Sequence, residues 1–166
     1  MIKRLLELNA DCVNSTDNQG STILHVAARH GLGVEKLKLI RLTIDRYDDL
    51  SLILDRNGCS AIHVACRHGI SVDSFQQILT IDDSLWQQDN TSEMPLHKAC
   101  RGGHLEIIQE LLERDIASVQ KRNMRGELPV HILAKKAGKN TEVLDSVQYT
   151  EVIFRLLLSH PEAMSQ

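Results

Sequence analysis

The sequence is poor in the features that nucleic-acid-binding, secreted and membrane proteins depend on. Aromatic residues make up only 3% of the 166 residues, and the formal net charge is -3. Base-stacking platforms need aromatics and phosphate binding needs excess cations, so both composition and charge argue against a nucleic-acid partner. Four scattered cysteines are too few for a secreted disulfide framework. No apolar run approaches the ~20 residues of a membrane helix, and no signal-peptide pattern opens the chain. We therefore expect an intracellular protein, cytoplasmic or nuclear, with reduced thiols and no membrane insertion.

The chain instead contains one sequence segment that is repeated four times. Four stretches align: "DNQGSTILHVAARHG" (17–31), "DRNGCSAIHVACRHG" (55–69), "DNTSEMPLHKACRGG" (89–103) and "NMRGELPVHILAKKAG" (123–138). Each contains one histidine at the same place, and the spacings between these histidines are 38, 34 and 34 residues. They are His25, His63, His97 and His131. Such a period indicates stacked units that share a continuous core.

The repeated unit has the pattern of two helices. Leu24, Ala27, Ala28 and Gly31 fall at helical spacing and predict a short helix with a small-residue stripe, ended by a left-handed glycine. Leucines and isoleucines at the same spacing over 105–112 predict a longer amphipathic helix. A turn of the form D-x-x-G separates one unit from the next. One unit cannot bury its own apolar stripe, so the units must stack.

This pattern resembles the ankyrin repeat, whose signature D-x-x-G-x-T-P-L-H-x-A-A-x-x-G is echoed by "DNTSEMPLHKACRGG" and "DNQGSTILHVAARHG". The resemblance covers essentially the whole chain and implies an all-α solenoid of helix-turn-helix units with hairpin-like loops. We expect one domain over residues 1–166. It divides into a partial repeat (1–16), repeat 1 (17–54), repeat 2 (55–88), repeat 3 (89–122) and repeat 4 (123–166), the last with an inter-helix insertion near 135–150.

The copies differ at their helix starts. Repeats 1 and 2 place Thr22 and Ser60 at the first cap, where a hydroxyl is favoured. Repeats 3 and 4 instead place proline at the first helical position, after Met94 and Leu128. Ser92 stands where the other repeats have glycine, so a left-handed backbone there would be strained.

The histidines and cysteines raise the question of chemistry. The resemblance implies that the repeated histidine is structural, bonding backbone groups and joining one repeat's turn to its neighbour. Cys66 and Cys100 occupy a small position that alanine fills in the other repeats, so we expect buried apolar contacts. Cys59, in a turn, is expected to be the most exposed thiol. A Cys/His metal or redox protein remains an alternative, although no C-x-x-C spacing, Gly-rich phosphate loop or G-x-S-x-G elbow supports it. We predict no enzyme activity and no cofactor or metal.

The resemblance also predicts a binding surface. Cations recur four residues after each histidine, on the helix face that lines the concave groove of ankyrin stacks. We name this column the basic ladder: Arg29, Arg67, Arg101 and Lys135. The predicted turn tips add Gln19, Asn57, Thr91 and Arg125. Acidic residues gather elsewhere, as in "DRYDD" (45–49) and "IDDS" (81–84), which favours an acidic partner at the groove.

We therefore expect a protein-interaction module with a concave groove. The alternative is a regulatory or scaffold segment of a longer protein whose activity lies elsewhere. The chain opens and closes with second-helix sequences, so self-association through uncapped ends is a further expectation.

Overall fold

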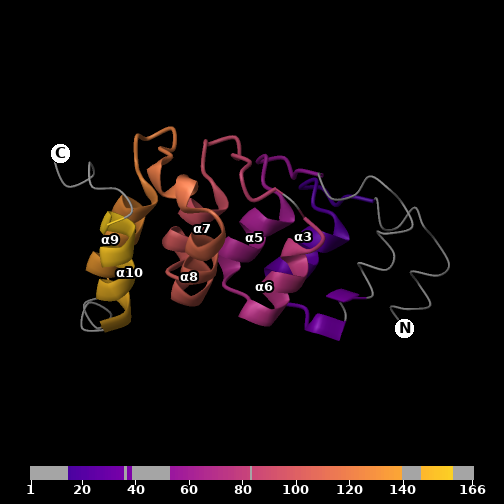
Figure 1. The fold of residues 1–166 in the computed structure, drawn as a ribbon. Helices are drawn as coiled ribbons and strands as arrows, with labels where there is room; N and C mark the ends of the chain where they lie inside the picture. Colours follow the sequence, from indigo (N-terminus) through magenta and orange to yellow (C-terminus); the bar gives the residue numbers. More distant parts are fainter. Residues whose placement is uncertain (1–14, 36, 39–52, 83, 140–146, 159–166) are drawn as a thin grey trace.

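The described elements form two layers of helices stacked along one axis (Figure 1). The structure is a computed structural model that describes residues 15–35, 37–38, 53–82, 84–139 and 147–158. The short first helices are α3 (Ile23–His30), α5 (Ala61–His68), α7 (Pro95–Gly102) and α9 (Pro129–Lys139). The second helices are α6 (Val72–Leu79), α8 (Leu105–Arg114) and α10 (Val147–Leu158), and a 3₁₀ turn spans Ile116–Gln120. All elements in the described ranges are helical, which confirms the predicted all-α repeat fold.

The short helices pack side by side because their facing side chains are small. α5 lies between α3 and α7, and α7 also packs against α9. Ala28, Cys66 and Cys100 are completely buried at these contacts, as expected. The equivalent Ala134 is exposed, so the expectation that it fills the same buried position is wrong. α9 is the last short helix of the described stack, and no described helix covers its outer side.

Glycines end three of the four short helices as predicted. Gly31, Gly69 and Gly103 follow α3, α5 and α7 with φ values of 60°, 68° and 78°. These left-handed conformations place the glycine N–H on a carbonyl of the preceding turn. Repeat 4 differs, because α9 continues through Gly138 and ends at Lys139. Its extra turn of helix takes up the first part of the predicted insertion.

The turn between repeats 2 and 3 carries a strained residue. Ser92 has φ 57°, so it adopts the left-handed conformation that its three glycine counterparts adopt. The sequence predicted strain if the backbone were left-handed there, and the backbone is left-handed. A side chain in this region costs about 1 kcal/mol or more relative to glycine.

The turn tips are joined by a ladder of backbone hydrogen bonds. The N–H of Arg56 donates to the carbonyl of Gln19 at 2.9 Å, and that of Asn90 donates to Asn57 at 3.0 Å. The N–H of Met124 continues the ladder to the carbonyl of Thr91 at 3.0 Å. Because each bond joins one repeat to the next, the tips are held in fixed order and their side chains are left to face outwards.

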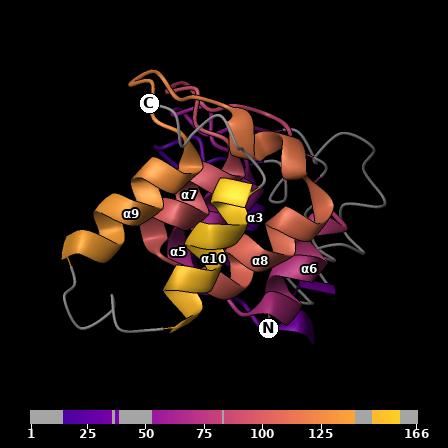
Figure 2. The same ribbon diagram turned by 60° about the vertical axis from the view of Figure 1, so that its left-hand side comes forward.

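The second helices supply the large side chains of the core. Phe75, Ile78, Ile108, Leu111 and Leu156 are at most 2% exposed. α10 packs against both α8 and α9, as Figure 2 shows from the side. It begins at Val147, a few residues earlier than the predicted "EVIFRLLLSH" helix at 151–160. The predicted extension of repeat 1 near 43–54 lies almost entirely outside the described residues.

Candidate functional site

The repeated histidines join neighbouring repeats through backbone groups. Nε2 of His25 lies 2.9 Å from the carbonyl oxygen of Cys59, and Nε2 of His97 lies 3.3 Å from that of Glu127. Nδ1 of each ring accepts the backbone N–H at the start of its own helix, for example that of Met94 at 3.1 Å. Since a carbonyl only accepts and an amide only donates, each ring is neutral with its proton on Nε2. The predicted structural role is confirmed for these histidines.

His63, which is completely buried, follows the same pattern. Its Nε2 donates to the carbonyl oxygen of Glu93 at 3.1 Å, and its Nδ1 accepts the N–H of Ser60 at 3.3 Å. Burial lowers the pKa of His63 and, likewise, that of His97. A neutral ring engaged on both nitrogens holds the fold together and is not free to act as a base.

The predicted hydroxyl-bearing residues stand at the starts of their helices and also contact the repeated histidines. The hydroxyls of Thr22 and Ser60 lie 2.8 and 3.0 Å from Nδ1 of His25 and His63, respectively. Thr22 and Ser60 are the N-cap residues of α3 and α5, and each belongs to a capping box in which the histidine at N3 accepts the backbone N–H of the cap residue. The N–H of Ile62, in the first turn of α5, is bound by the carboxylate of Asp82 at 3.0 Å. Asp82, one of the acidic residues of "IDDS", is only 1% exposed, so its charge is used inside the stack and not at the surface.

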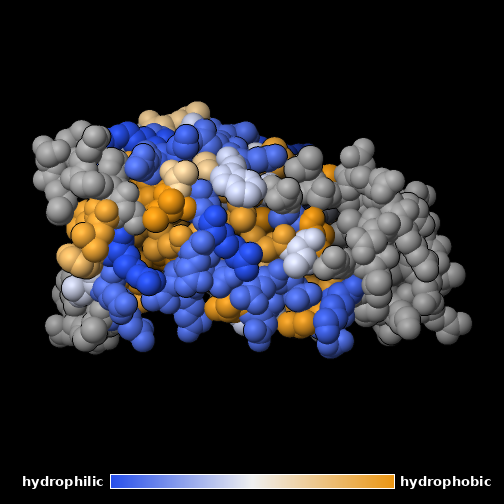
Figure 3. All heavy atoms as spheres, viewed as in Figure 1, coloured by the Kyte–Doolittle hydropathy of each residue, from blue (hydrophilic) through white to orange (hydrophobic). Residues whose placement is uncertain are grey.

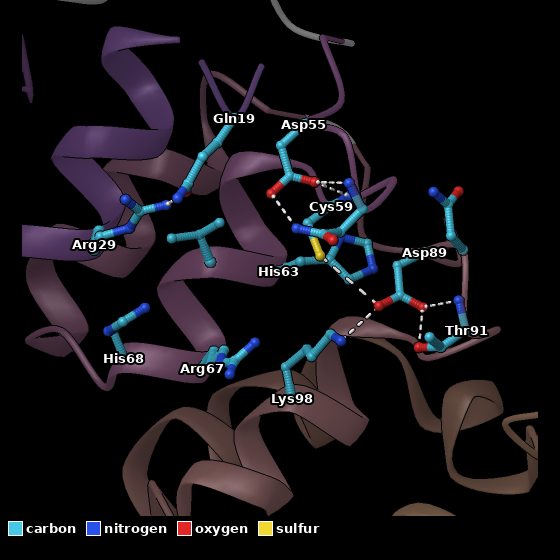
Figure 4. Close-up of a pocket in the computed structure, with 13 residues that line it drawn as sticks. Gln19, Arg29, Asp55, Cys59, His63, Arg67, His68, Asp89, Thr91 and Lys98 are labelled. Carbon is cyan, nitrogen blue, oxygen red and sulfur yellow. Dashed lines mark hydrogen bonds and ion pairs between the residues drawn. The ribbon is translucent and has the colours of Figure 1, made fainter. Parts of the chain in front are cut away.

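Five of the eight predicted contact residues line one hollow of about 430 Å³. It lies across repeats 1, 2 and 3, between the turn tips and the short helices (Figure 4). Those five residues are Gln19, Arg29, Asn57, Arg67 and Thr91. The other three, Arg101, Arg125 and Lys135, line a second hollow of about 410 Å³ beside α9. The eight residues therefore lie in two neighbouring hollows, which we name groove A (about 430 Å³) and groove B (about 410 Å³).

The basic ladder is not uniform along the stack. Arg101 forms an ion pair with Glu93, and Lys135 forms one with Glu127 at 2.5 Å. Each of these carboxylates stands four residues before the repeated histidine of its own repeat. Repeats 1 and 2 have Ser21 and Cys59 at that position. The carboxylate four residues before the histidine thus determines whether the cation four residues after it is paired.

Sequence reasoning missed a buried ionic network beneath this ladder. Nζ of Lys98 lies 2.5 Å from Asp89 and 2.8 Å from Glu93, and all three side chains are at most 8% exposed. The lysine and further hydrogen bonds from Thr91 overcome the effect of burial and lower the pKa of Asp89 to about 2. The signal was present in the alignment, because Lys98 stands where the other repeats have Val26, Val64 and Ile132.

The thiols offer little reactivity. Cys66 and Cys100 are fully buried, and burial raises the pKa of both thiols well above the usual value. Cys59 is also buried, at 8% exposure, and desolvation raises its pKa to about 12. The expectation of an exposed Cys59 is wrong, because the next repeat's Asp89 packs against it, with Sγ 3.7 Å from the carboxylate. These three cysteines are free, and no group of three or more metal-binding side chains occurs among the described residues.

His68 and His104, which lie outside the repeated histidine position, have different environments. His68 is exposed at the edge of groove A, where Figure 4 shows it between Arg29 and Arg67. His104 is half-buried, and its Nε2 lies 3.1 Å from the carbonyl oxygen of Arg67 in the preceding repeat. His104 therefore has a role in joining repeats that the sequence did not predict.

An apolar surface lies at the α10 end of the stack. Ile116, Phe154 and Leu158 are each about 60% exposed, and Figure 3 shows apolar side chains at the surface near α10. The predicted self-association at the N-terminal end concerns residues outside the described ranges. Self-association therefore stays a prediction.

The comparisons with known proteins agree with this architecture. Residues 62–163 match a family model described as ankyrin repeats in three copies. A search of curated proteins finds no match. Proteins of the matched family are typically non-enzymatic, usually intracellular, and generally act as protein–protein interaction modules. In the described part of the chain, no helix is long and apolar enough to cross a membrane. The family match, together with the inter-repeat hydrogen bonds of the histidines and the glycine-ended short helices, shows that this chain belongs to the ankyrin-repeat family.

Proposed function

We propose that this protein binds a partner protein through grooves A and B, on the side of the stack formed by the turn tips and the short helices. The observation that carries the proposal is that five of the eight contact residues chosen from sequence line a single hollow across three repeats. The family match supports a protein partner, because ankyrin repeats generally act as interaction modules.

The surface is suited to recognition for a physical reason. The backbone groups of the turn tips are used in the ladder between repeats, so the tips are rigid platforms for exposed side chains such as Asn57 and Thr91. A rigid surface loses little conformational entropy on binding. The cations Arg29 and Arg67 at its floor favour a partner segment that carries acidic residues.

The thiols are buried, and the neutral histidines are hydrogen-bonded at both ring nitrogens. Neither observation supports the alternative of a Cys/His metal or redox protein. A regulatory or scaffolding role within a longer protein would use this same surface, so one experiment tests both forms of the proposal. We also propose an intracellular location, in line with the usual location of the family.

Site-specific photo-crosslinking tests the proposal directly. A photoreactive phenylalanine analogue is placed at Asn57 or Thr91 on the tips, and, as a control, at exposed Glu106 on α8. After irradiation in extract from the native source, we expect one protein to be linked from both tip positions and not from Glu106. Linkage from Glu106 alone, or from no position, would contradict binding in the grooves.

A further inference from the structure

We propose that acidic side chains of the partner are bound by Arg29 and Arg67 in repeats 1 and 2, and that Glu93 and Glu127 block the equivalent cations of repeats 3 and 4. This inference rests on the proposed function, protein binding in the grooves, and specifies the partner's chemistry and register there.

The first argument is the pairing of each cation. Arg101 and Lys135 already have carboxylate partners from their own repeats. Neither Arg29 nor Arg67 forms an ion pair with any residue in the described ranges. The Arg29 guanidinium donates a long hydrogen bond of 3.5 Å to Oε1 of Gln19, which is an uncharged acceptor.

The second argument is that repeats 1 and 2 have no carboxylate at the position that Glu93 and Glu127 occupy in repeats 3 and 4. Ser21 is 2% exposed and uncharged. Cys59, with a pKa of about 12, is a neutral thiol at physiological pH. A partner's carboxylate would therefore meet Arg29 and Arg67 without displacing an existing ion pair, whereas at Arg101 and Lys135 it would compete with one.

The third argument concerns the other charges in groove A. Asp89 is bound to Lys98, and Asp55 accepts the N–H groups of Asn57 and Cys59 within its own turn. Both carboxylates lie on the tip side of Figure 4, whereas Arg29, Arg67 and His68 lie on the other side. The groove therefore has a cationic side and an anionic side. This polarity fixes which flank of a bound segment carries the acidic residues.

The spacing of the two arginines gives the register. They occupy equivalent positions on α3 and α5, which pack against each other, and packed helices lie about 8–10 Å apart. A segment in the polyproline II conformation rises about 3.1 Å per residue with three residues per turn, so two acidic residues three positions apart lie on the same face at about that separation. We therefore infer a partner segment with the pattern acidic-x-x-acidic, lying across repeats 1 and 2.

His68 provides an independent readout of a bound carboxylate. Partial burial lowers its pKa, and so do the nearby charges of Arg29, Arg67, His30 and His104. His30 and Arg29 face it from α3, Arg67 from its own helix, and His104 from the turn before α8. A carboxylate bound between the two arginines would raise the pKa of His68, so binding should take up a proton and strengthen as pH falls.

The test starts from a display library of random 15-residue peptides selected against the wild-type protein. We expect enriched peptides to share two acidic residues three apart. Labelled copies of an enriched peptide are then titrated by fluorescence anisotropy against Arg29→Gln/Arg67→Gln and against the matched control Arg114→Gln/Lys121→Gln, which removes two exposed cations that line neither groove. We expect about tenfold weaker binding for the first double variant and wild-type affinity for the control. Circular dichroism checks that both variants keep the helix content of the wild type.

The outcomes separate the two levels of the proposal. If no peptide is enriched, the proposed function fails and this inference fails with it. If peptides are enriched without an acidic pair, or if the two double variants weaken binding equally, only the inference is overturned.

A gain-of-function variant tests the blocking role of Glu127. Glu127→Ser copies the serine of repeat 1 and leaves Lys135 without its carboxylate. An enriched peptide extended by an acidic tail towards repeat 4 should bind this variant more tightly than it binds the wild type. Equal affinity for the two proteins would overturn the assignment of Glu127 as a blocking group.

Discussion

Nε2 of His63 donates a hydrogen bond to the backbone carbonyl of Glu93, 3.1 Å away and 30 residues later in the chain. The same Glu93 binds Lys98 and Arg101 through its side chain. Glu93 therefore accepts the inter-repeat hydrogen bond from His63 of repeat 2 through its backbone, and forms ion pairs with the cations of repeat 3 through its side chain. This arrangement couples the stacking of the repeats to the charge of the groove.

Replacing His63 with alanine should destabilise the protein by about 3 kcal/mol, because it leaves a cavity and removes partners from buried polar groups. His131→Ala is the matched control. The ring of His131 accepts the N–H of Leu128 at 3.1 Å and makes no hydrogen bond to a further repeat among the described residues, so its loss should cost about 1 kcal/mol. Urea unfolding followed by circular dichroism measures both. Equal losses would contradict the inter-repeat role of His63.

Gly69→Ala should be more destabilising than Gly126→Ala, although both glycines have positive φ. A Cβ at Gly69 would lie 2.1 Å from Nδ1 of His104, whereas one at Gly126 would meet nothing within 4 Å. The Gly126 variant isolates the backbone cost of about 1–2 kcal/mol. The Gly69 variant must also displace the His104 ring from the Arg67 carbonyl. Similar midpoints in urea for the two variants would show that His104 moves without cost.

Lys98→Met should cost about 3–5 kcal/mol, because it leaves the buried carboxylates of Asp89 and Glu93 without their shared cation. Lys135→Met is the surface control. The Lys135 side chain is 67% exposed in its ion pair with Glu127, so its loss should cost less than about 1 kcal/mol. Thermal unfolding of the two variants measures the contrast. A Lys98 variant as stable as the Lys135 variant would show that the buried network contributes no net stability.

The free energy of unfolding should decrease in two separate pH ranges as the solution is acidified. His63 and His97 have lowered pKa values in the folded state, so the unfolded chain binds protons first, and stability declines as pH falls below the ordinary histidine value of about 6.5. Asp89, Glu93 and Glu127 also have lowered pKa values, so their contribution is present above the unfolded carboxylate values near pH 4 and is lost below them. Urea midpoints between pH 8 and pH 3 measure both. Midpoints that stay constant from pH 7 to pH 5 would contradict the first range.

The contact residues could be chosen from sequence because each repeat places them at a constant distance from its histidine. Arg67 and Arg101 occupy equivalent positions in the alignment, and the pattern gave no reason to distinguish them. Glu93 distinguishes them in the structure, since the turn before α7 folds its carboxylate back to Arg101. A comparison of the residues four before each histidine, Ser21, Cys59, Glu93 and Glu127, would have suggested the difference.

Burial was harder to predict wherever a neighbouring repeat provides the cover. Cys59 lies in a turn that looks exposed by itself, yet Asp89 of the next repeat packs on it. Asp82 follows a second helix and carries a charge, yet it is buried and binds the start of α5, 20 residues earlier. Ala134 was expected to be buried like Cys100, but no described helix covers it.

The sequence by itself determined the fold, because the apolar stripe and the histidine of each short helix are local patterns repeated in every unit, and a glycine ends three of the four short helices. It also determined the role of the histidines, since a residue needed at every layer must serve the stack. Only the tertiary structure decided which cations are paired and which polar groups are buried. Those properties depend on side chains that meet across a turn or across two repeats, and stacking geometry, not spacing along the chain, brings them together.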